Sequence, residues 1–167
     1  MVSKLILFTK MLSKIKKSNI RVLFVVALTA CITSLSAFVP ANTPDAMLGT
    51  WLTGSKKGHV QIYKQGNQYY GKIVWLKEPI DPKTNQPKTD VNNPDSKKKE
   101  QPLLGLVNLR GFTYEGGNVW EEGKIYDPEN GKEYSCKITL RDKNTLDVRG
   151  YIGISLIGRT DTWVRVK

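Results

Sequence analysis

The sequence predicts an all-β protein: an antiparallel eight-stranded meander, closed into a barrel and preceded by a signal peptide. Two observations predict this fold. Residues 42–167 contain eight short segments in which apolar and polar residues alternate with a period of two. Turn-forming residues rich in Gly, Asn and Asp separate most of these segments, so that neighbouring strands should pair antiparallel. Closing such a sheet removes both unpaired edges.

The alternation is clearest in residues 134–140. Tyr134, Cys136, Ile138 and Leu140 fall on one face there, and polar side chains fall on the other. The same pattern predicts strands over residues 48–53, 59–64, 68–77, 104–113, 118–126, 145–152 and 160–166. One stretch interrupts this succession of strands and turns. Residues 78–102 are rich in proline and in charged residues, which predicts a long polar loop. This loop either has a function over a barrel mouth or is a plain excursion of the chain.

Residues 1–41 have the composition of an export signal. They hold six Lys or Arg, no Asp or Glu, and one apolar run over residues 22–39. Cleavage after Ala37 or Ala41 would release residues 42–167 as a single barrel domain, and translation starts at either Met1 or Met11. We expect the domain to be exported, and thus periplasmic or secreted.

Two other fates of the N-terminal segment stay open. Residues 28–31, with the sequence Leu-Thr-Ala-Cys, resemble a bacterial lipobox, in which Cys31 would be lipidated and become the mature N-terminus. The segment could also remain as an uncleaved anchor, although its apolar run is shorter than the roughly 20 residues that a span requires. All three alternatives place the domain outside the cytoplasm.

Charge and cysteine content narrow the classes of partner. The chain carries a net charge of +11, but six of these charges lie in residues 1–41, which leaves +5 for the domain. A nucleic-acid partner is not expected, because the densest basic run, residues 97–99, lies in the polar loop without interleaved aromatic residues. A weak attraction to an anionic envelope surface remains open. Cys136 is the single cysteine of the domain, so no internal disulfide can form, and we interpret it as a buried apolar side chain.

Aromatic residues are numerous for a domain of this size. They either fill the barrel core or line a ligand pocket, where rings form an apolar wall and their O–H or N–H groups orient a polar ligand end. Strand parity places Tyr69, Gly71, Ile73 and Trp75 on one inward face. Arg159, next to a strand end, could reach a barrel mouth, whereas parity places Arg149 outside. The candidate ligand-binding residues are Trp51, Tyr69, Trp75, Trp120, Tyr126, Tyr134 and Arg159.

Four oxygen-bearing side chains gather within the polar loop. Asp90, Asn92, Asn93 and Asp95 are calcium-like in ligand type, but the glycine and the distal glutamate of an EF-hand loop are absent. Such side chains also cap their own turns. We therefore expect a structured loop anchored on the barrel and no metal site.

No catalytic residues are predicted. The chain has one histidine, His59, next to Gly58 at a strand start, and it lacks the serine-hydrolase, zinc-protease and phosphate-loop motifs. Glu121 and Glu122 are adjacent on a strand, which by parity puts them on opposite faces. We expect no enzyme activity and no cofactor.

Seven segments along the chain resemble one known family. They occur in order over residues 48–167, and the resemblance is to an exported bacterial family labelled domain of unknown function 2147. It implies a lipocalin-like β-barrel and a secreted or periplasmic location, and it supplies no reaction or ligand. The segments are residues 49–53, 70–74, 90–95, 103–106, 123–134, 146–153 and 158–160, together with Trp163.

Two functions from different classes fit these observations. The first is binding of a small lipophilic or amphipathic ligand inside the barrel. The alternative is an envelope structural or protein-interaction module whose barrel is solid. A hollow interior of several hundred Å³ would favour the first, and an interior packed to protein density would favour the second. The ligand and the oligomeric state are not predicted.

Overall fold

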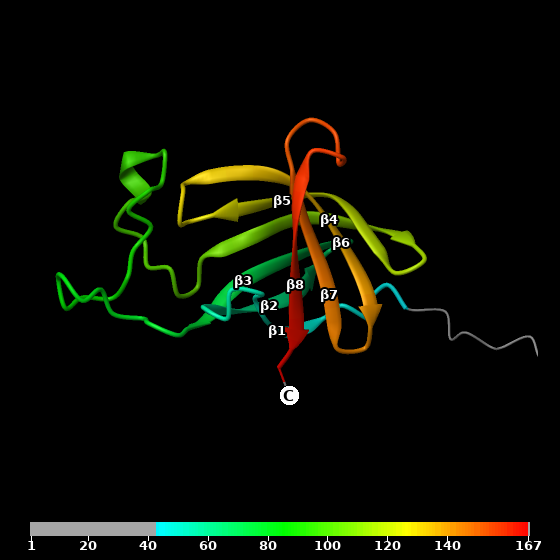
Figure 1. The fold of residues 1–167 in the computed structure, drawn as a ribbon, viewed down its shortest axis with the longest axis horizontal. Helices are drawn as coiled ribbons and strands as arrows, with labels where there is room; N and C mark the ends of the chain where they lie inside the picture. The colour runs from blue at the N-terminus through cyan, green and yellow to red at the C-terminus, as the bar shows by residue number, and fades with distance from the viewer. Residues whose placement is uncertain (1–42, 167) are drawn as a thin grey trace, which may run out of the picture. The chain divides into compact units, whose positions relative to one another are not determined.

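The protein is an all-β barrel in a computed structural model, which describes residues 43–166 (Figure 1). The predicted signal peptide, its cleavage sites and Cys31 lie outside the described residues. Eight strands follow one another round the barrel in chain order. They are β1 (Gly49–Leu52), β2 (Gly58–Gln65), β3 (Gln68–Leu76), β4 (Val107–Gly116), β5 (Val119–Asp127), β6 (Lys132–Asp142), β7 (Thr145–Tyr151) and β8 (Gly158–Arg165).

The predicted antiparallel meander and its closure are both confirmed. Each strand pairs antiparallel with the next, and β8 pairs with β1. The closing seam is short, with Trp51 opposite Arg165 and Leu52 opposite Val164. The closed sheet and the core described below are built from residues 43–166, so we expect residues 42–167 to fold without residues 1–41.

Aromatic side chains pack one end of the barrel solid. Trp51, Tyr69, Phe112 and Trp120 are each at most 2% exposed, and the Tyr69 and Trp120 rings meet edge to face with their centroids 6.4 Å apart. Edge-to-face pairs of this kind stabilise a core beyond the apolar area that they bury. We call this end, where the β2–β3, β4–β5 and β6–β7 turns lie, the closed end.

The chain just before β1 covers the closed end. The indole Nε1 of Trp51 donates to the carbonyl of Met47 at 2.9 Å, and that of Trp120 donates to the carbonyl of Pro44 at 3.1 Å. Met47 itself is fully buried in the core. These buried N–H groups therefore have partners, as the interior requires, and the partners fix residues 43–48 across the barrel end.

Arg165 ties this cover to the barrel seam. Its guanidinium carbon lies 4.1 Å from the centroid of the Trp51 ring, in a cation–π arrangement. The same group donates to the carbonyls of Leu48 at 2.6 Å, Ala46 at 2.8 Å and Lys143 at 2.7 Å. Burial lowers the pKa of this guanidinium. One side chain thus joins β1, β8, the N-terminal cover and the β6–β7 turn.

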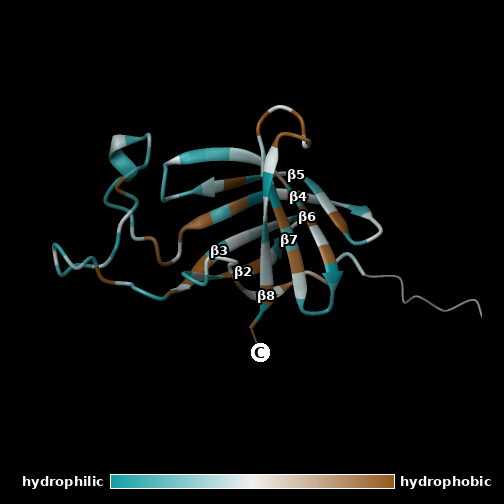
Figure 2. Cartoon of the chain, in the orientation of Figure 1, coloured by the Kyte–Doolittle hydropathy of each residue, from teal (hydrophilic) through white to brown (hydrophobic). Residues whose placement is uncertain are grey.

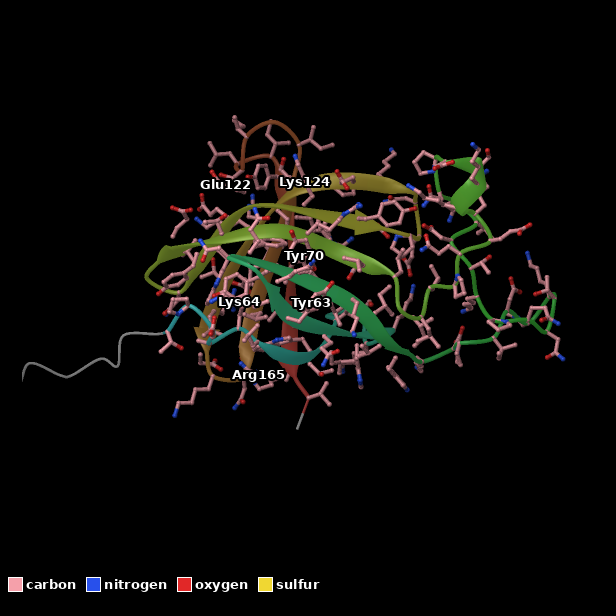
Figure 3. The ribbon with its side chains drawn as sticks, turned by 180° about the vertical axis from the view of Figure 1, so that it is seen from behind. Tyr63, Lys64, Tyr70, Glu122, Lys124 and Arg165 are labelled. Atoms are coloured by element: carbon pink, nitrogen blue, oxygen red, sulfur yellow. The ribbon has the colours of Figure 1, made fainter. Side chains whose placement is uncertain are left out.

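Asp45 adds a polar bond to the cover. Its Oδ1 accepts from the Tyr69 hydroxyl at 2.7 Å and from Lys64 Nζ at 3.0 Å. The hydrogen bond from Tyr69 and, next, that from Lys64 lower the pKa of the Asp45 carboxyl. Figure 3 labels Lys64 in the view from behind; its Nζ also lies over the Tyr69 ring, 5.3 Å from the centroid. Tyr63 and Tyr70, labelled in the same view, have ring centroids 5.9 Å apart.

Two β-bulges overturn predictions made from strand parity. Opposite β2, Trp75 pairs with His59 while Ile73 pairs with Val60, so that Val74 is the extra residue of a bulge. The predicted inward position of Trp75 is therefore wrong. Its side chain is 41% exposed and lies against His59, with ring centroids 4.3 Å apart.

The second bulge lies in β5. Trp120 pairs with Ile138 and Gly123 with Cys136, which leaves two residues of β5 opposite one residue of β6. Glu122 has φ 62° there. Both Trp120 and Gly123 are buried, so the parity that put Glu121 and Glu122 on opposite faces does not hold. Glu121 instead forms an ion pair with Lys137, at 2.6 Å.

The predicted polar loop joins β3 to β4 and extends to the side of the barrel (Figure 1). It contains one short 3-10 turn, η1 (Ser96–Lys98), and two isolated bridges, Ile80 with Pro87 and Thr89 with Pro102. In residues 43–166 there is no helix of the length and hydrophobicity needed to cross a membrane.

We predict that Arg165→Met lowers the free energy of unfolding by about 2–4 kcal/mol, because it removes the cation–π contact and leaves the carbonyls of Leu48 and Ala46 without a donor. Urea denaturation of residues 42–167 measures the change. Arg110→Met is the matched control, since Arg110 pairs with Glu133 on the exposed surface, and its loss should cost at most about 1 kcal/mol. Equal effects of the two substitutions would contradict the role given to Arg165.

Candidate functional site

The end of the barrel opposite the closed end opens into a cavity of about 790 Å³. Its mouth is formed by the β1–β2 turn, the β5–β6 turn and the β7–β8 loop, all of which contribute lining residues. Small-molecule sites in proteins commonly have volumes of about 300–1,000 Å³. The cavity is therefore large enough to hold an organic ligand.

Branched aliphatic side chains and one indole form the inner wall. Val60, Ile73, Val148 and Trp163 line the cavity and are each at most 6% exposed. Ile125 lines it too and packs against the core. These residues belong both to the core and to the cavity wall, so the cavity continues directly from the packed end of the barrel.

Gly150 of β7 leaves space in the cavity because it has no side chain. A Cβ atom at this position would lie 3.5 Å from Ile125 Cγ2 and 3.7 Å from Tyr134 Cβ, which are ordinary van der Waals contacts. The register puts Gly150 opposite the buried Cys136, and it lines the cavity. A side chain at position 150 would therefore occupy cavity space without a clash at its first atom.

Asn108 places an unpaired polar group in the wall. The residue is 7% exposed and lines the cavity. Its Oδ1 atom is buried and has no hydrogen-bond partner within residues 43–166. Leaving a buried acceptor unpaired costs about 1–3 kcal/mol, and such an atom in a cavity wall marks where a donor on a ligand or a water would bind.

Arg159 and Asp161 line the cavity from β8. Asp161 Oδ2 accepts from Trp163 Nε1 at 2.7 Å and from the Gly54 amide at 3.2 Å, so this carboxylate fixes the indole and the β1–β2 turn. Arg159 is exposed, and no ion pair involves it in the described part of the chain. Its guanidinium is available to a ligand with an anionic or polar end.

The structure separates the predicted ligand-binding residues into three groups. Tyr126, Tyr134 and Arg159 line the cavity. Trp51, Tyr69 and Trp120 do not line it, because they form the closed end and their polar atoms bind the N-terminal cover. Trp75 lies outside the barrel, where the bulge at Val74 puts it.

The predicted loop residues hold the long loop on the barrel. Asp90 is fully buried, and it accepts from the Tyr126 hydroxyl at 2.8 Å and from Asn93 Nδ2 at 2.6 Å. Asn93 Oδ1 in turn accepts from the Asp95 amide at 2.9 Å. Burial and, next, the hydrogen bond to Asp90 raise the pKa of Tyr126 to about 12.

Asn92 binds the loop to the β5–β6 turn at the cavity mouth. Its Nδ2 donates to the carbonyls of Pro128 at 3.1 Å and Glu129 at 3.0 Å. Gly131 allows this close approach: it has φ 70°, and a Cβ there would lie 2.0 Å from the carbonyl oxygen of Asn92. The loop thereby positions the β5–β6 turn, whose residues line the cavity.

Reasoning from the sequence missed Asn108, Asp161 and the whole β7–β8 loop as parts of the site. Asp161 could have been found, because it has the same strand parity as Arg159 and Trp163. Asn108 could not, because it lies where the β3–β4 register shifts between Gly71 and Lys72, and an alternation pattern does not reveal a bulge.

The side chains that could carry covalent or metal chemistry are few. No group of three or more His, Cys, Asp or Glu residues suited to a metal ion occurs in residues 43–166. Cys136 is fully buried, and this burial raises the pKa of its thiol to about 12. The thiolate, which is the reactive form of cysteine, is therefore disfavoured.

A closed eight-stranded antiparallel meander, solid at one end and hollow at the other, defines the class of lipocalin-like barrels. The chain belongs to the bacterial family DUF2147, described as "uncharacterized protein conserved in bacteria", whose model matches residues 49–165.

Comparison with curated proteins finds no match. Among solved structures, the chain is similar to protein HP1028 of Helicobacter pylori, which is described as belonging to the lipocalin family. The TM-score is 0.62 at 21% sequence identity, with 72% of this chain and 83% of the other covered. At this identity the likeness establishes the lipocalin-like fold alone.

We predict that Tyr126→Phe loosens the long loop, because Asp90 loses a donor while it remains buried. The stability loss should be about 1–3 kcal/mol, with faster amide hydrogen exchange confined to residues 88–106 and 127–131. An unchanged exchange rate in these two segments would show that the Tyr126–Asp90 bond does not anchor the loop.

The raised pKa of Tyr126 predicts that the stability of the folded domain depends on pH. Tyr126 keeps its proton to about pH 12 when folded, whereas an unfolded tyrosine loses it near pH 10. Between these values the folded state binds more protons, so stability falls as the pH rises from about 10 to about 12. In Tyr126→Phe this fall should be shallower, which urea denaturation at a series of pH values would detect.

Proposed function

We propose that the protein binds a small lipophilic or amphipathic molecule inside its barrel and that it acts as a carrier without catalysis. The observation that carries this proposal is the cavity of about 790 Å³ with an apolar inner wall. A ligand that filled it would bury apolar surface, and each Å² of such surface contributes about 25 cal/mol. The lipocalin-like fold supports the proposal, because an eight-stranded barrel of this kind can hold one small ligand.

The polar groups of the cavity suggest how the ligand is oriented. Within residues 43–166, Asn108 offers a buried acceptor without a partner, and Arg159, near the mouth, forms no ion pair. An amphipathic ligand would place its chain or rings against Val60, Ile73 and Val148. Its polar or anionic end would then face Arg159.

The alternative of a solid interaction module fits less well. A packed barrel interior has few voids larger than a water molecule, whereas this barrel is hollow at one end. The long polar loop is held against the barrel through Asp90 and Asn92. The loop therefore has a structural role in shaping the mouth.

We further propose that the carrier works outside the cytoplasm, in the periplasm or as a secreted protein. The composition of residues 1–41 supports this location, since a basic start precedes an apolar run that ends in small residues. This location is compatible with residues 43–166, where Cys136 is the single cysteine and is buried, because the core and the cover hold the fold.

We predict that filling the cavity abolishes ligand uptake. Gly150→Phe adds a ring to the cavity wall, and the matched control Val164→Phe adds the same ring on the outer face of β8, where Val164 is 50% exposed. Fluorescence of anilinonaphthalene sulfonate (ANS), an aromatic anion, reports uptake. Gly150→Phe should bind the dye at least about tenfold more weakly than the unmodified domain, a loss of about 1.4 kcal/mol.

The control should bind ANS as the unmodified domain does. Circular dichroism and urea denaturation would show whether each variant is folded, because unfolded or loosely packed states also bind this dye. A folded Gly150→Phe protein with unchanged dye affinity would contradict binding inside the barrel.

A further inference from the structure

The loop between β7 and β8 exposes four aliphatic side chains beside the cavity mouth. Ile152, Ile154, Leu156 and Ile157 are 69%, 59%, 84% and 69% exposed. In Figure 2 this loop is the brown arch at the top of the view, beyond the ends of both strands. Four large aliphatics within six residues form a concentrated apolar patch, and such patches mark interaction sites on soluble proteins.

The backbone carbonyls of this loop are paired within the protein. The carbonyl of Ile154 accepts from the Ile157 amide at 3.0 Å, and that of Ile157 accepts from the Ile152 amide at 3.3 Å. Unpaired carbonyls would cost several kcal/mol each in a medium without water. Their pairing within the loop lowers the cost of removing it from water.

Arg149 supplies the other two bonds. Its Nε donates to the carbonyl of Ser155 at 2.8 Å and its Nη2 to the carbonyl of Leu156 at 3.2 Å, while Nη1 donates to the Thr160 hydroxyl at 3.0 Å. All four carbonyls of residues 154–157 therefore have donors. The same guanidinium joins the loop to Thr160 of β8.

Two cations flank the patch without acidic partners. Neither Arg149 nor Arg159 forms an ion pair in the described part of the chain. The nearby carboxylates are already engaged, since Asp147 pairs with Arg141 and Asp161 binds Trp163 and Gly54. Protein segments that combine exposed aliphatic side chains with neighbouring cations bind to anionic lipid surfaces.

We propose that the β7–β8 loop is a lipid-contacting element of this protein. Ile154 and Leu156, at its tip, enter the apolar layer of an anionic membrane surface, while Arg149 and Arg159 remain at the level of the headgroups. This contact goes beyond ligand carriage and does not depend on it.

The size of the loop favours a lipid surface over a protein partner. A stable protein interface requires about 800 Å² from each partner, with some 20–30 residues. Six residues on a convex arch do not supply such an area. Reversible membrane contact needs only a small buried apolar surface combined with electrostatic attraction.

The base of the loop is continuous with the cavity. Ile152 and Ile157 line the cavity, whereas Ile154 and Leu156 do not. Insertion of the tip would therefore bring the cavity mouth against the bilayer, and a lipophilic molecule could enter the barrel without crossing bulk water. Because the tip residues do not line the cavity, substitutions at the tip can test membrane contact without altering the ligand site.

The test is cosedimentation of residues 42–167 with phospholipid vesicles. This segment lacks the apolar run of residues 22–39, which would itself bind lipid. The variant carries Ile154→Asp and Leu156→Asp, and the matched control carries Ile80→Asp and Val91→Asp, two exposed aliphatics of the long loop. Vesicles of phosphatidylethanolamine and phosphatidylglycerol provide the anionic surface, and pure phosphatidylcholine provides the neutral one.

We expect the unmodified domain and the control to bind the anionic vesicles equally, and the tip variant to bind at least about tenfold more weakly, since two aliphatic side chains are lost from the apolar layer. Leu156→Cys carrying a polarity-sensitive dye should report an apolar environment on the anionic vesicles; Cys136 is buried and will not be labelled. ANS uptake by the tip variant should be unchanged, because its altered residues do not line the cavity.

Three outcomes would overturn the proposal. The first is that the domain fails to bind anionic vesicles. The second is that the tip variant binds as the unmodified domain does, which would assign the binding to charge elsewhere. The third is a dimer, seen by analytical ultracentrifugation, that the tip substitutions dissociate without changing vesicle binding, which would assign the patch to a second copy of the chain. In each case ANS uptake still tests ligand carriage separately.

Discussion

The fold depends on the contact between the Arg165 guanidinium and the Trp51 ring. The strands β1 and β8 meet over two residue pairs, which is a short seam for a barrel that must also support a hollow end. Arg165 lies at this seam, stacks on Trp51 and binds three carbonyls of the N-terminal cover and the β6–β7 turn. Because one planar cation satisfies so many groups at once, the closure of the sheet and the cover of the closed end depend on the same side chain. A lysine could not reproduce this arrangement, since it lacks the planar fork of donors.

The hollow end follows from how side-chain volume is distributed along the barrel. Trp51, Tyr69, Phe112 and Trp120 fill the closed end, whereas the open end has branched aliphatics and Gly150 at inward positions. Tyr126, Tyr134 and Trp163 line the space at the open end without filling it. The Asp161–Trp163 bond holds one indole between the two regions, and the long loop fixes the β5–β6 turn at the mouth through Asp90 and Asn92. The cavity is thus supported on its rim by polar bonds and on its inner wall by the core.

The sequence predicted the strands, their order and the closure of the barrel, because a period-two alternation and turn residues are local signals. It predicted the site only in part. Tyr126, Tyr134 and Arg159 line the cavity, but an inward aromatic residue looks the same in a sequence whether it packs a closed end or lines a hollow one, as Trp51 and Trp120 illustrate. The bulges at Val74 and Glu122 shift parity by one residue, so Trp75 turns outward. The hydrogen bonds from Arg149 to the β7–β8 loop join residues six and seven positions apart. No pattern in the sequence predicts them.

We propose that the hollow end of the barrel holds a ligand. Native mass spectrometry of residues 42–167 tests it most directly, with the domain measured after gentle purification, after extraction with organic solvent, and after incubation of the extracted domain with a long-chain fatty acid. If the barrel carries a ligand, the spectra should show a reproducible excess mass that extraction removes, or uptake of one fatty acid per barrel by the extracted domain. A bare mass in all three measurements would contradict it and would favour a module that acts through its surface.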